Sequence, residues 1–551
     1  MILAKRTVYS LLLALVCADL VFRYPLDVPH ELGADTTFIH TLATSIAVEG
    51  RASWIVHPTS YFGLYALSYP SAIPFYFAAG TILTGIPVEG IMLILGWVTS
   101  VVGVLGAFLV ARKLRRDDIF ALTVATLLAF SPFFVKDTFW VGSTRGFVVS
   151  LVPVFLLLAI GSLRTHQLRQ VALAFVLFIV LAAIHRMGFL VFFVIVAYMF
   201  AVPFHKLTQR LRFALYKYER VARYAFVLTT MGSFIGVFYV QFLYPGVGGA
   251  DVAEQYGSGA FFHGDSFPVL LANMGVSLTG KVGPLFPVAL VGLVAYTWRR
   301  PKEATDKFVL TTMLLFLPLL SLRDYMGEFL IPLFTILVVI GLVSARRFFP
   351  KRGKLVAIGL AVLVIASVGF SWEMKDYWRE RYVTDAPIED GTYDAAVYLR
   401  FSTDETIIAN EGLGGGQLAA ISGRPVLPIG GASQHWTGPQ QIAWHFVDPG
   451  TVSVRLLEFG NVSFNSDEVY VPVGVRNAEI DWETIFFYRE PAAADQQFLR
   501  YHIHYVVVLA TLPDSFISYG LERPSPYLTT VLPTTSYVVY DNGAYRIWFR
   551  G

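Results

Sequence analysis

The sequence predicts a mainly α-helical polytopic membrane protein with about eleven transmembrane helices, followed by an external α/β domain. Three observations support this class. Long apolar segments recur through the first two thirds of the chain, Lys and Arg are distributed unevenly between the intervening loops, and the last third lacks long apolar runs. Of the 551 residues, 55% are hydrophobic and only 15% are charged, and the mean hydropathy is +0.59. This composition excludes an ordinary soluble enzyme and a disordered chain.

Charge and cysteine content narrow the function classes further. The net charge of +3 is too small to indicate a polyanionic partner, so we expect no nucleic acid to bind. Cys17 is the single cysteine of the chain, which excludes an intramolecular disulfide framework and a cysteine-ligated zinc site.

Eleven apolar segments are candidates for membrane spans, because a transmembrane helix needs about 20 mostly apolar residues. The first, residues 7–22, follows Lys5 and Arg6, and no small-residue cleavage site follows it. We therefore expect a retained span and not a signal peptide. The other ten lie near residues 89–111, 118–135, 144–163, 169–184, 187–203, 222–243, 281–298, 308–322, 326–345 and 354–371. The chain is thus expected to comprise a membrane domain, residues 1–371, and a soluble domain, residues 372–551.

The basic residues predict the orientation of these spans. Loops assigned to the cytoplasm carry 23 Lys and Arg residues, against seven on the outer side of the membrane domain. This asymmetry requires that the apolar stretch 72–86 does not cross the bilayer, so we expect it to lie on the outer leaflet as an interfacial segment. The prediction is a multi-pass protein of the cell membrane with a cytoplasmic N-terminus and an extracytoplasmic C-terminal domain.

The C-terminal domain shows short strand-like and helix-like stretches separated by Pro, Gly and Asp. We expect helices over residues 392–401 and 417–422, and strands over residues 406–409, 505–509 and 536–540. The glycine cluster Gly412–Gly416 is expected to form a loop between the first strand and the second helix. It lacks the Gly-Lys-Ser/Thr sequence of a phosphate-binding loop.

Ionisable residues gather at the expected outer ends of different hairpins, where such residues are functional candidates. The first external loop carries Glu31 and Asp35, and the second carries Asp137 and Arg145. Two later turns contribute His185, Arg186, Arg323, Asp324 and Glu328, and Asp19 lies near the outer end of the first span.

Each of these residues could also be a solvated turn residue or, for Asp35, a helix cap. Their convergence on one side favours a site. Carboxylates and guanidiniums that face one compartment suit a phosphate-containing ligand, because Arg binds phosphate in a bidentate manner. A carboxylate could act as general base on an acceptor or bind a divalent cation.

Several motifs follow one another in the first 160 or so residues. After the first span come the acidic motif Glu31-Leu-Gly-Ala-Asp35 and then Ser68-Tyr-Pro70-Ser-Ala-Ile-Pro74 with an apolar segment. The second span ends in a basic cluster at 111–116, and the third ends in Phe130-Ser-Pro132. This order resembles the GT-C superfamily of membrane glycosyltransferases. That superfamily includes protein O-mannosyltransferases, lipid A aminoarabinose transferases and, more distantly, the catalytic subunit of oligosaccharyltransferase.

The resemblance implies a GT-C-type fold, an acidic residue of the first loop in the active site, and a sugar donor linked to polyprenyl phosphate or diphosphate. Asp35 takes this role, with Glu31 second and Asp137 as the acidic residue of the second loop. The chain departs from the family pattern at Ser71, where a second Pro is usual, and in the spread of the acidic pair over Glu31 and Asp35.

The expected function is therefore transfer of a sugar (hexosyl or pentosyl) from a polyprenyl-phosphate-linked donor to a glycan, lipid or protein acceptor on the outer face. The expected catalytic residues are Asp35, Glu31 and Asp137, with Asp35 and Asp137 as candidate ligands of a divalent metal ion, Mg or Mn. The expected substrate-binding residues are Arg145, His185, Arg186, Arg323, Asp324 and Glu328.

Two alternatives stay open. One is an oligosaccharyltransferase-like enzyme that acts on protein, although the chain has Asn410-Glu411-Gly-Leu-Gly where those enzymes carry a tryptophan-containing motif. The other is a non-catalytic transporter or flippase for a lipid carrier. Transporters usually show repeated halves and charges near the bilayer midplane, whereas here no repeat is evident and the charges gather at the outer ends.

Overall fold

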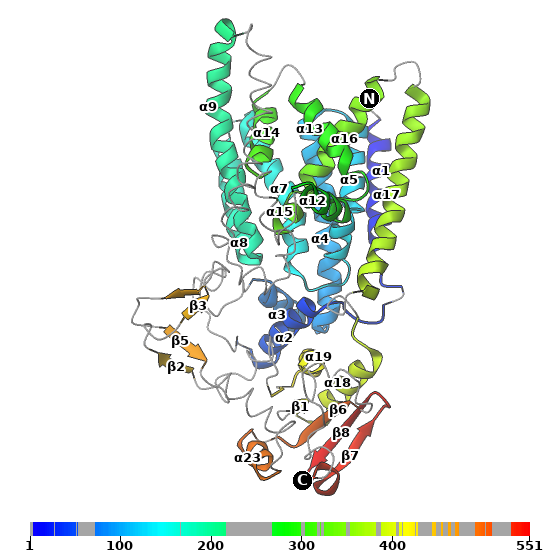
Figure 1. Ribbon diagram of the computed structural model, residues 1–551, viewed down its shortest axis with the longest axis vertical. Coiled ribbons are helices and arrows are strands. Elements are labelled where there is room, and N and C mark those ends of the chain that lie inside the picture. Colours follow the sequence, from blue (N-terminus) through cyan, green and yellow to red (C-terminus); the bar gives the residue numbers. More distant parts are fainter. Residues whose placement is uncertain are drawn as a thin grey trace.

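In the computed structural model, a bundle of helices forms one end of the molecule and a smaller α/β part forms the other, with the N-terminus at the far end of the bundle and the C-terminus in the α/β part (Figure 1). The structure describes residues 4–26, 28–50, 52, 72–165, 167–215, 267–298, 303–316, 320, 324–348, 353–381, 387–403, 407–409, 412–424, 426–427, 444–447, 453–455, 461–463, 469–472, 491–501, 503–509 and 531–551.

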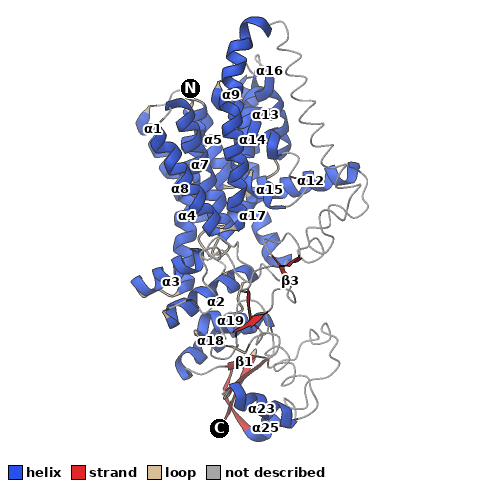
Figure 2. Ribbon diagram, turned by 90° about the vertical axis from the view of Figure 1, so that its left-hand side faces the viewer, coloured by secondary structure: helices blue, strands red, loops and turns tan. Residues whose placement is uncertain are grey.

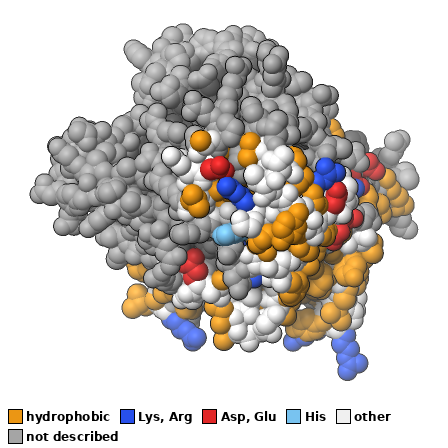
Figure 3. Space-filling model, turned by 90° about the horizontal axis from the view of Figure 1, so that it is seen from below, with side chains coloured by type: hydrophobic (Ala, Val, Ile, Leu, Met, Phe, Trp, Pro, Cys, Tyr) orange, Lys and Arg blue, Asp and Glu red, His pale blue; other side chains and the backbone are white. Residues whose placement is uncertain are grey.

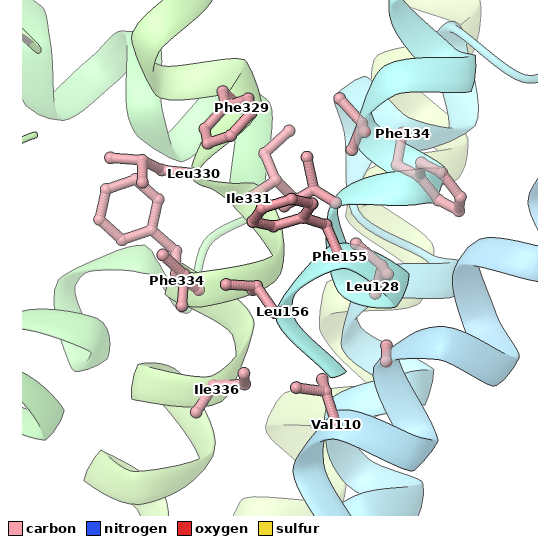
Figure 4. Close-up of a cluster of buried hydrophobic side chains, with 14 of the residues drawn as sticks. Val110, Leu128, Phe134, Phe155, Leu156, Phe329, Leu330, Ile331, Phe334 and Ile336 are labelled. Atoms are coloured by element: carbon pink, nitrogen blue, oxygen red, sulfur yellow. The ribbon is translucent and has the colours of Figure 1, made fainter. Parts of the chain in front are cut away.

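The bundle is built around α4 (Val88–Leu114), which packs against α1 (Lys5–Phe22), α5 (Asp118–Ala129) and α7 (Thr144–Thr165). Its core is one large apolar cluster. In this cluster, side chains from the α5–α7 region face side chains from α15 (Asp324–Phe329) and α16 (Ile331–Phe348), as Figure 4 shows. The first group includes Leu128, Phe134, Phe155 and Leu156, and the second includes Phe329, Ile331 and Phe334. The other helices are α6 (Pro132–Lys136), α8 (Leu168–Ile184), η2 (Arg186–Leu190), α9 (Val191–Leu215), α12 (Phe267–Val282), α13 (Phe286–Trp298), α14 (Ala304–Phe316) and α17 (Gly353–Arg381).

The number of eleven spans is not confirmed. Among the described residues, α4 and α7 are long and apolar enough to cross a membrane, and residues 272–298 would add a third span if the bent pair α12 and α13 counted as one. Five further apolar helices are shorter, and the expected span 222–243 lies outside the described residues. The membrane-spanning prediction for the remaining segments therefore stays a prediction.

Several segments expected to form single helices are interrupted. Residues 118–135 divide into α5 and α6 because Pro132 cannot donate the backbone hydrogen bond that would continue α5. Residues 281–298 bend by 98° between α12 and α13, next to Gly283 with its φ of 107°. The expected spans 187–203 and 326–345 begin with the short helices η2 and α15. A hydropathy profile does not detect such breaks, since apolar residues continue through them.

The apolar stretch 72–86 forms helix α3 (Ala72–Thr84), which packs against α2 (Ala34–Glu49) and α4. At about 1.5 Å per residue this helix is about 20 Å long, well short of the roughly 30 Å hydrocarbon core of a bilayer. Helices α2 and α3 lie between the bundle and the C-terminal part in both ribbon views (Figures 1 and 2). Tyr76, Ile82 and Leu83 are exposed, as expected for an interfacial helix.

The C-terminal part contains helices and strands at the predicted positions. A four-stranded sheet has the order β1 (Ile407–Ala409), β6 (Tyr505–Leu509), β8 (Tyr545–Arg550) and β7 (Ser536–Asp541). Strand β1 runs parallel to β6, and β8 pairs antiparallel with both β6 and β7. The remaining elements are α18 (Asp390–Ser402), α19 (Gly412–Ser422), α23 (Pro491–Tyr501), α25 (Leu532–Thr535), and two small sheets that pair β2 (Trp444–Val447) with β5 (Val469–Pro472) and β3 (Ser453–Arg455) with β4 (Asn461–Ser463).

The loop expected at Gly412–Gly416 is wrong, because these residues form the first turns of α19. Glycine is a poor helix former, but here the helix packs along α2, and tertiary packing outweighs propensity. Thr41 Oγ1 donates to the carbonyl oxygen of Gly416 at 3.2 Å, and Thr44 Oγ1 donates to that of Ala420 at 3.0 Å. The first loop thus connects the bundle to the C-terminal part.

The predicted domain boundary at residue 371 falls inside α17, which continues to Arg381. The division into residues 1–371 and 372–551 stays a prediction from composition. Seen from below, the described surface of the C-terminal end shows acidic and basic side chains and a histidine among hydrophobic ones (Figure 3).

Candidate active site

Asp35 lies in the first turn of α2, at the point where the first loop meets the bundle. The helix begins after Gly33, which has a φ of 94°, and no side chain caps it, so Asp35 does not serve as the N-cap. Its carboxylate instead accepts a hydrogen bond from the guanidinium of Arg145, with 2.6 Å between Oδ2 and Nη2. The Asp35 side chain is 67% exposed, so it can also meet a ligand from solvent.

Arg145, in the first turn of α7, links Asp35 to carboxylates on other elements. Its Nη1 atom lies 4.0 Å from Oε1 of Glu328, and its guanidinium carbon lies 5.8 Å from the ring centroid of Tyr325. Lys281, near the end of α12, places Nζ 3.7 Å from the same Glu328 oxygen. Four helices, α2, α7, α12 and α15, therefore bring two carboxylates and two cations together.

Asp137 immediately follows α6 and is buried. The pKa of its carboxyl is raised from 3.8 to about 7. Burial is the main cause, the Arg145 cation opposes the rise, and the negative charge of Glu328 adds to it. Within the described part of the chain, Asp137 Oδ2 and Glu328 Oε2 have no hydrogen-bond partner although both are buried. Two unpaired carboxylate oxygens beside cations leave acceptor capacity for a ligand.

The loop that follows Asp137 is held in a constrained conformation. Trp140 has a φ of 44°, which is uncommon for a residue other than glycine. Its indole Nε1 donates to the carbonyl oxygen of Glu89 at 3.1 Å, and its own carbonyl accepts from the Leu32 amide at 3.2 Å. Gly146 lets α7 approach this loop closely, because a Cβ there would lie 2.1 Å from the carbonyl oxygen of Asp137.

Glu31, the second expected acid of the first loop, has a different environment. It is buried, and its Oε1 lies 2.6 Å from Nδ1 of His40. Burial raises the pKa of the Glu31 carboxyl, and His40 opposes this rise. The Glu31 carbonyl oxygen accepts from the amide of Ile388, which ties this part of the loop to the segment before α18. Among the described residues, the Glu31 carboxylate therefore contacts His40, whereas Asp35 contacts Arg145.

Of the expected substrate-binding residues, Arg145, His185 and Glu328 lie at this cluster. His185 is buried, its Nδ1 accepts from the Met187 amide at 3.0 Å, and its ring meets that of Tyr325 edge-on at 5.6 Å between centroids. Arg323 and the side chains of Arg186 and Asp324 lie outside the described residues.

Two members of the cluster, Lys281 and Tyr325, were not among the predicted site residues. Lys281 is a basic residue at the expected outer end of a span, which is the signal that selected the others. Asp19, grouped with the candidate acids, pairs with Arg23, 2.5 Å away, and shows no contact with this cluster in the described residues.

The residues proposed as metal ligands do not form a ligand set. In the described part of the chain, no group of three or more His, Cys, Asp or Glu side chains is arranged to hold a metal ion. The carboxylate of Asp35 contacts a guanidinium, and Arg145 also provides the main positive charge near Asp137. The role of Asp35 and Asp137 as ligands of a Mg or Mn ion therefore stays a prediction.

No protein-family model and no curated protein matches this sequence. Solved structures do match. One is the oligosaccharyltransferase of Archaeoglobus fulgidus tethered to an acceptor peptide. The alignment covers 99% of this chain and 74% of the oligosaccharyltransferase chain at 12% identity, with a TM-score of 0.55. ArnT from Cupriavidus metallidurans aligns over 99% of this chain and 98% of its own at 13% identity, with a TM-score of 0.52. The mycobacterial arabinofuranosyltransferase AftD aligns over 100% of this chain and 42% of its own at 15% identity, also with a TM-score of 0.52.

These similarities define the class of fold. All three structures are GT-C glycosyltransferases, and this chain has the GT-C fold. The expectation drawn from the motifs of the first 160 residues is therefore confirmed at the level of the fold.

Proposed function

We propose that this protein is a membrane glycosyltransferase that moves a sugar from a polyprenyl-phosphate-linked donor to an acceptor on the outer face. The observation that carries the proposal is the arrangement of Arg145 and Lys281 against the carboxylates of Asp35, Asp137 and Glu328. Cations with adjacent acids are what a reaction with a phosphate leaving group and a proton to remove requires.

In the proposed reaction, Asp137 is the general base. An acceptor hydroxyl or amide attacks the anomeric carbon of the donor, its proton passes to the Asp137 carboxylate, and the bond between the anomeric carbon and the phosphate oxygen breaks. A carboxyl with a pKa of about 7 suits this task, since a base is most effective when its pKa lies near the working pH.

Arg145 and Lys281 are proposed to bind the phosphate that leaves with the polyprenyl chain. The guanidinium can contact two phosphate oxygens, and the ammonium adds a second positive charge. Asp35 and Glu328 hold these cations in place through contacts of 2.6 Å and 3.7–4.0 Å. We assign no step to a metal ion.

Other proteins with this fold give the proposal a context. ArnT from Cupriavidus metallidurans has been solved with undecaprenyl phosphate bound, and the Archaeoglobus fulgidus oligosaccharyltransferase has been solved with an acceptor peptide tethered to it. The proposal itself depends on the charges of this chain's own site. Whether the acceptor is a glycan, a lipid or a protein is decided by experiment.

The test is sugar transfer by the purified protein in detergent or liposomes, with radiolabelled polyprenyl-phosphate sugars as donors and glycan, lipid and peptide acceptors in separate arms. We expect transfer by the wild type and its loss in Asp137→Asn and Arg145→Ala. Asp118→Asn is the matched control, because Asp118 is also buried and also has an Arg nearby, with 3.1 Å between its Oδ1 and Nε of Arg112, at the start of α5. Donor binding without transfer in the wild type would favour a carrier-lipid transporter and refute the proposal.

A further inference from the structure

A buried ion pair lies inside the bundle apart from the candidate active site. Arg23 Nη1 and Asp19 Oδ1 are 2.5 Å apart, and both side chains are fully buried. Charges are costly to remove from water unless they are paired and hydrogen-bonded, so an ion pair inside an apolar bundle indicates a specific role.

The guanidinium of Arg23 contacts both ends of the short segment that carries Asp137. Its Nη2 donates to the carbonyl oxygen of Ala129, the last residue of α5, at 3.0 Å. Its Nε donates to Oγ1 of Thr138, the residue next to Asp137, at 2.7 Å. Between these two points the guanidinium carbon lies 5.1 Å from the ring centroid of Phe134, which is part of the apolar cluster in Figure 4.

Further hydrogen bonds fix the pair itself to the rest of the bundle. Asp19 Oδ2 accepts from Ser100 Oγ of α4 at 2.6 Å, and Thr138 Oγ1 donates to the carbonyl oxygen of Phe134 at 2.5 Å. Through Arg23, Thr138 is therefore linked to Asp19 of α1 and Ser100 of α4, in addition to its own bond to Phe134.

From this geometry we propose that Arg23 is a positioning residue, which holds the Asp137 carboxylate in place through the hydroxyl of Thr138. The inference rests on the proposed role of Asp137 as the base. Asp137 Oδ2 has no hydrogen-bond partner among the described residues, so the placement of this oxygen depends strongly on the adjacent backbone. A misplacement of about 1 Å at a reacting group can lower a rate by about 100-fold.

The test compares two substitutions of Thr138 with a matched control. Thr138→Val keeps the shape of the side chain but removes its hydroxyl, and Thr138→Ser keeps the hydroxyl. Thr312→Val is the control, because Thr312 is also fully buried in the bundle and its hydroxyl also donates to the carbonyl four residues earlier, at 2.9 Å.

We expect Thr138→Val to lower kcat by about 10- to 100-fold with little change in KM for the donor, and to shift the pH midpoint of the rate. Thr138→Ser and Thr312→Val should keep the kcat and pH profile of the wild type. A Thr138→Val protein with the kcat and pH profile of the wild type would overturn the inference. So would a Thr138→Ser protein as impaired as Thr138→Val, because the methyl group and not the hydroxyl would then matter.

A second readout does not depend on turnover. Hydrophobic carbodiimides modify protonated buried carboxyls, so the pH dependence of Asp137 labelling, followed by mass spectrometry, reports its ionisation directly. We expect Thr138→Val, but not Thr312→Val, to shift the labelling midpoint. If the wild type transfers no sugar, the proposed function fails, yet this measurement still tests the link between Thr138 and Asp137. An unchanged midpoint in Thr138→Val would overturn that link.

Discussion

The pH dependence of sugar transfer should follow the ionisation of Asp137. Burial places the pKa of this carboxyl near 7, so a base at this position is about half ionised at pH 7, about one tenth at pH 6 and about one hundredth at pH 5. We therefore expect kcat/KM for the donor, which reports the ionisation of the ligand-free protein, to fall about tenfold for each unit below pH 6.5 and to reach a plateau above pH 8. Initial rates with donor well below its KM between pH 5 and 9 measure this profile.

Replacement of Asp137 by Asn should abolish this profile. The variant keeps the size of the side chain but cannot accept the proton, and removal of a general base typically lowers a rate by about 100- to 10,000-fold. The residual rate should no longer fall between pH 8 and pH 5. A wild-type rate that is constant over this range, or an Asn variant that retains the wild-type profile, would refute the role of Asp137 as base.

The stability of the same variant provides an independent check. The folded-state pKa of Asp137 is raised, so its contribution to stability is complete below its unfolded value of about 3.8 and is lost as the pH rises through about 7. Asparagine resembles the neutral carboxyl at every pH. The melting temperature of Asp137→Asn should therefore exceed that of the wild type at pH 8 and match it more closely at pH 4. A lower melting temperature at pH 8 would contradict the cause assigned to the shift.

Three further predictions concern the surroundings of the site. Arg145→Ala should lower the rate of transfer by about 100-fold or more. Arg145→Lys should lower it less, because the ammonium keeps the charge but loses bidentate contact with phosphate. Equal rates for Arg145→Ala and wild type would contradict phosphate binding. Gly146→Ala should reduce kcat and thermal stability together, since the new Cβ would lie 2.1 Å from the carbonyl oxygen of Asp137. Wild-type kinetics in this variant would contradict the prediction and show that the loop tolerates displacement. Thr44→Val should weaken the packing of α19 on α2 by about 1 kcal/mol, because it removes the 3.0 Å hydrogen bond to Ala420. Amide hydrogen exchange over residues 412–422 should become faster without a change in the bundle. Unaltered exchange would mean that this bond contributes little.

Local sequence patterns were sufficient for much of the C-terminal part. The predicted strand at 505–509 is β6, and the helix expected over 392–401 lies within α18. These elements have strong local signals, namely a β-branched run and a helix-compatible segment between turn residues. The glycine-rich start of α19 shows the limit of such signals, because its helical conformation depends on packing against α2, more than 360 residues earlier in the chain.

Helix breaks could not be located from hydropathy. Pro132 and Gly283 lie inside segments that average hydropathy assigns to single spans, and such an average reports only the composition of a segment. The breaks nevertheless matter for the site, since Asp137 follows the short helix after Pro132, and Lys281 lies directly before the bend at Gly283.

From the sequence we could predict a membrane protein with a GT-C-type fold and a set of candidate ionisable residues that includes Asp35, Asp137, Arg145 and Glu328. Which of these residues meet became known from the three-dimensional structure alone. Asp35 and Arg145 are 110 residues apart and lie 2.6 Å from each other, whereas Glu31, four residues before Asp35, pairs with His40. The physical reason is that apolar patterning specifies which segments are buried, but the rotation and depth of each helix follow from side-chain packing across the whole bundle.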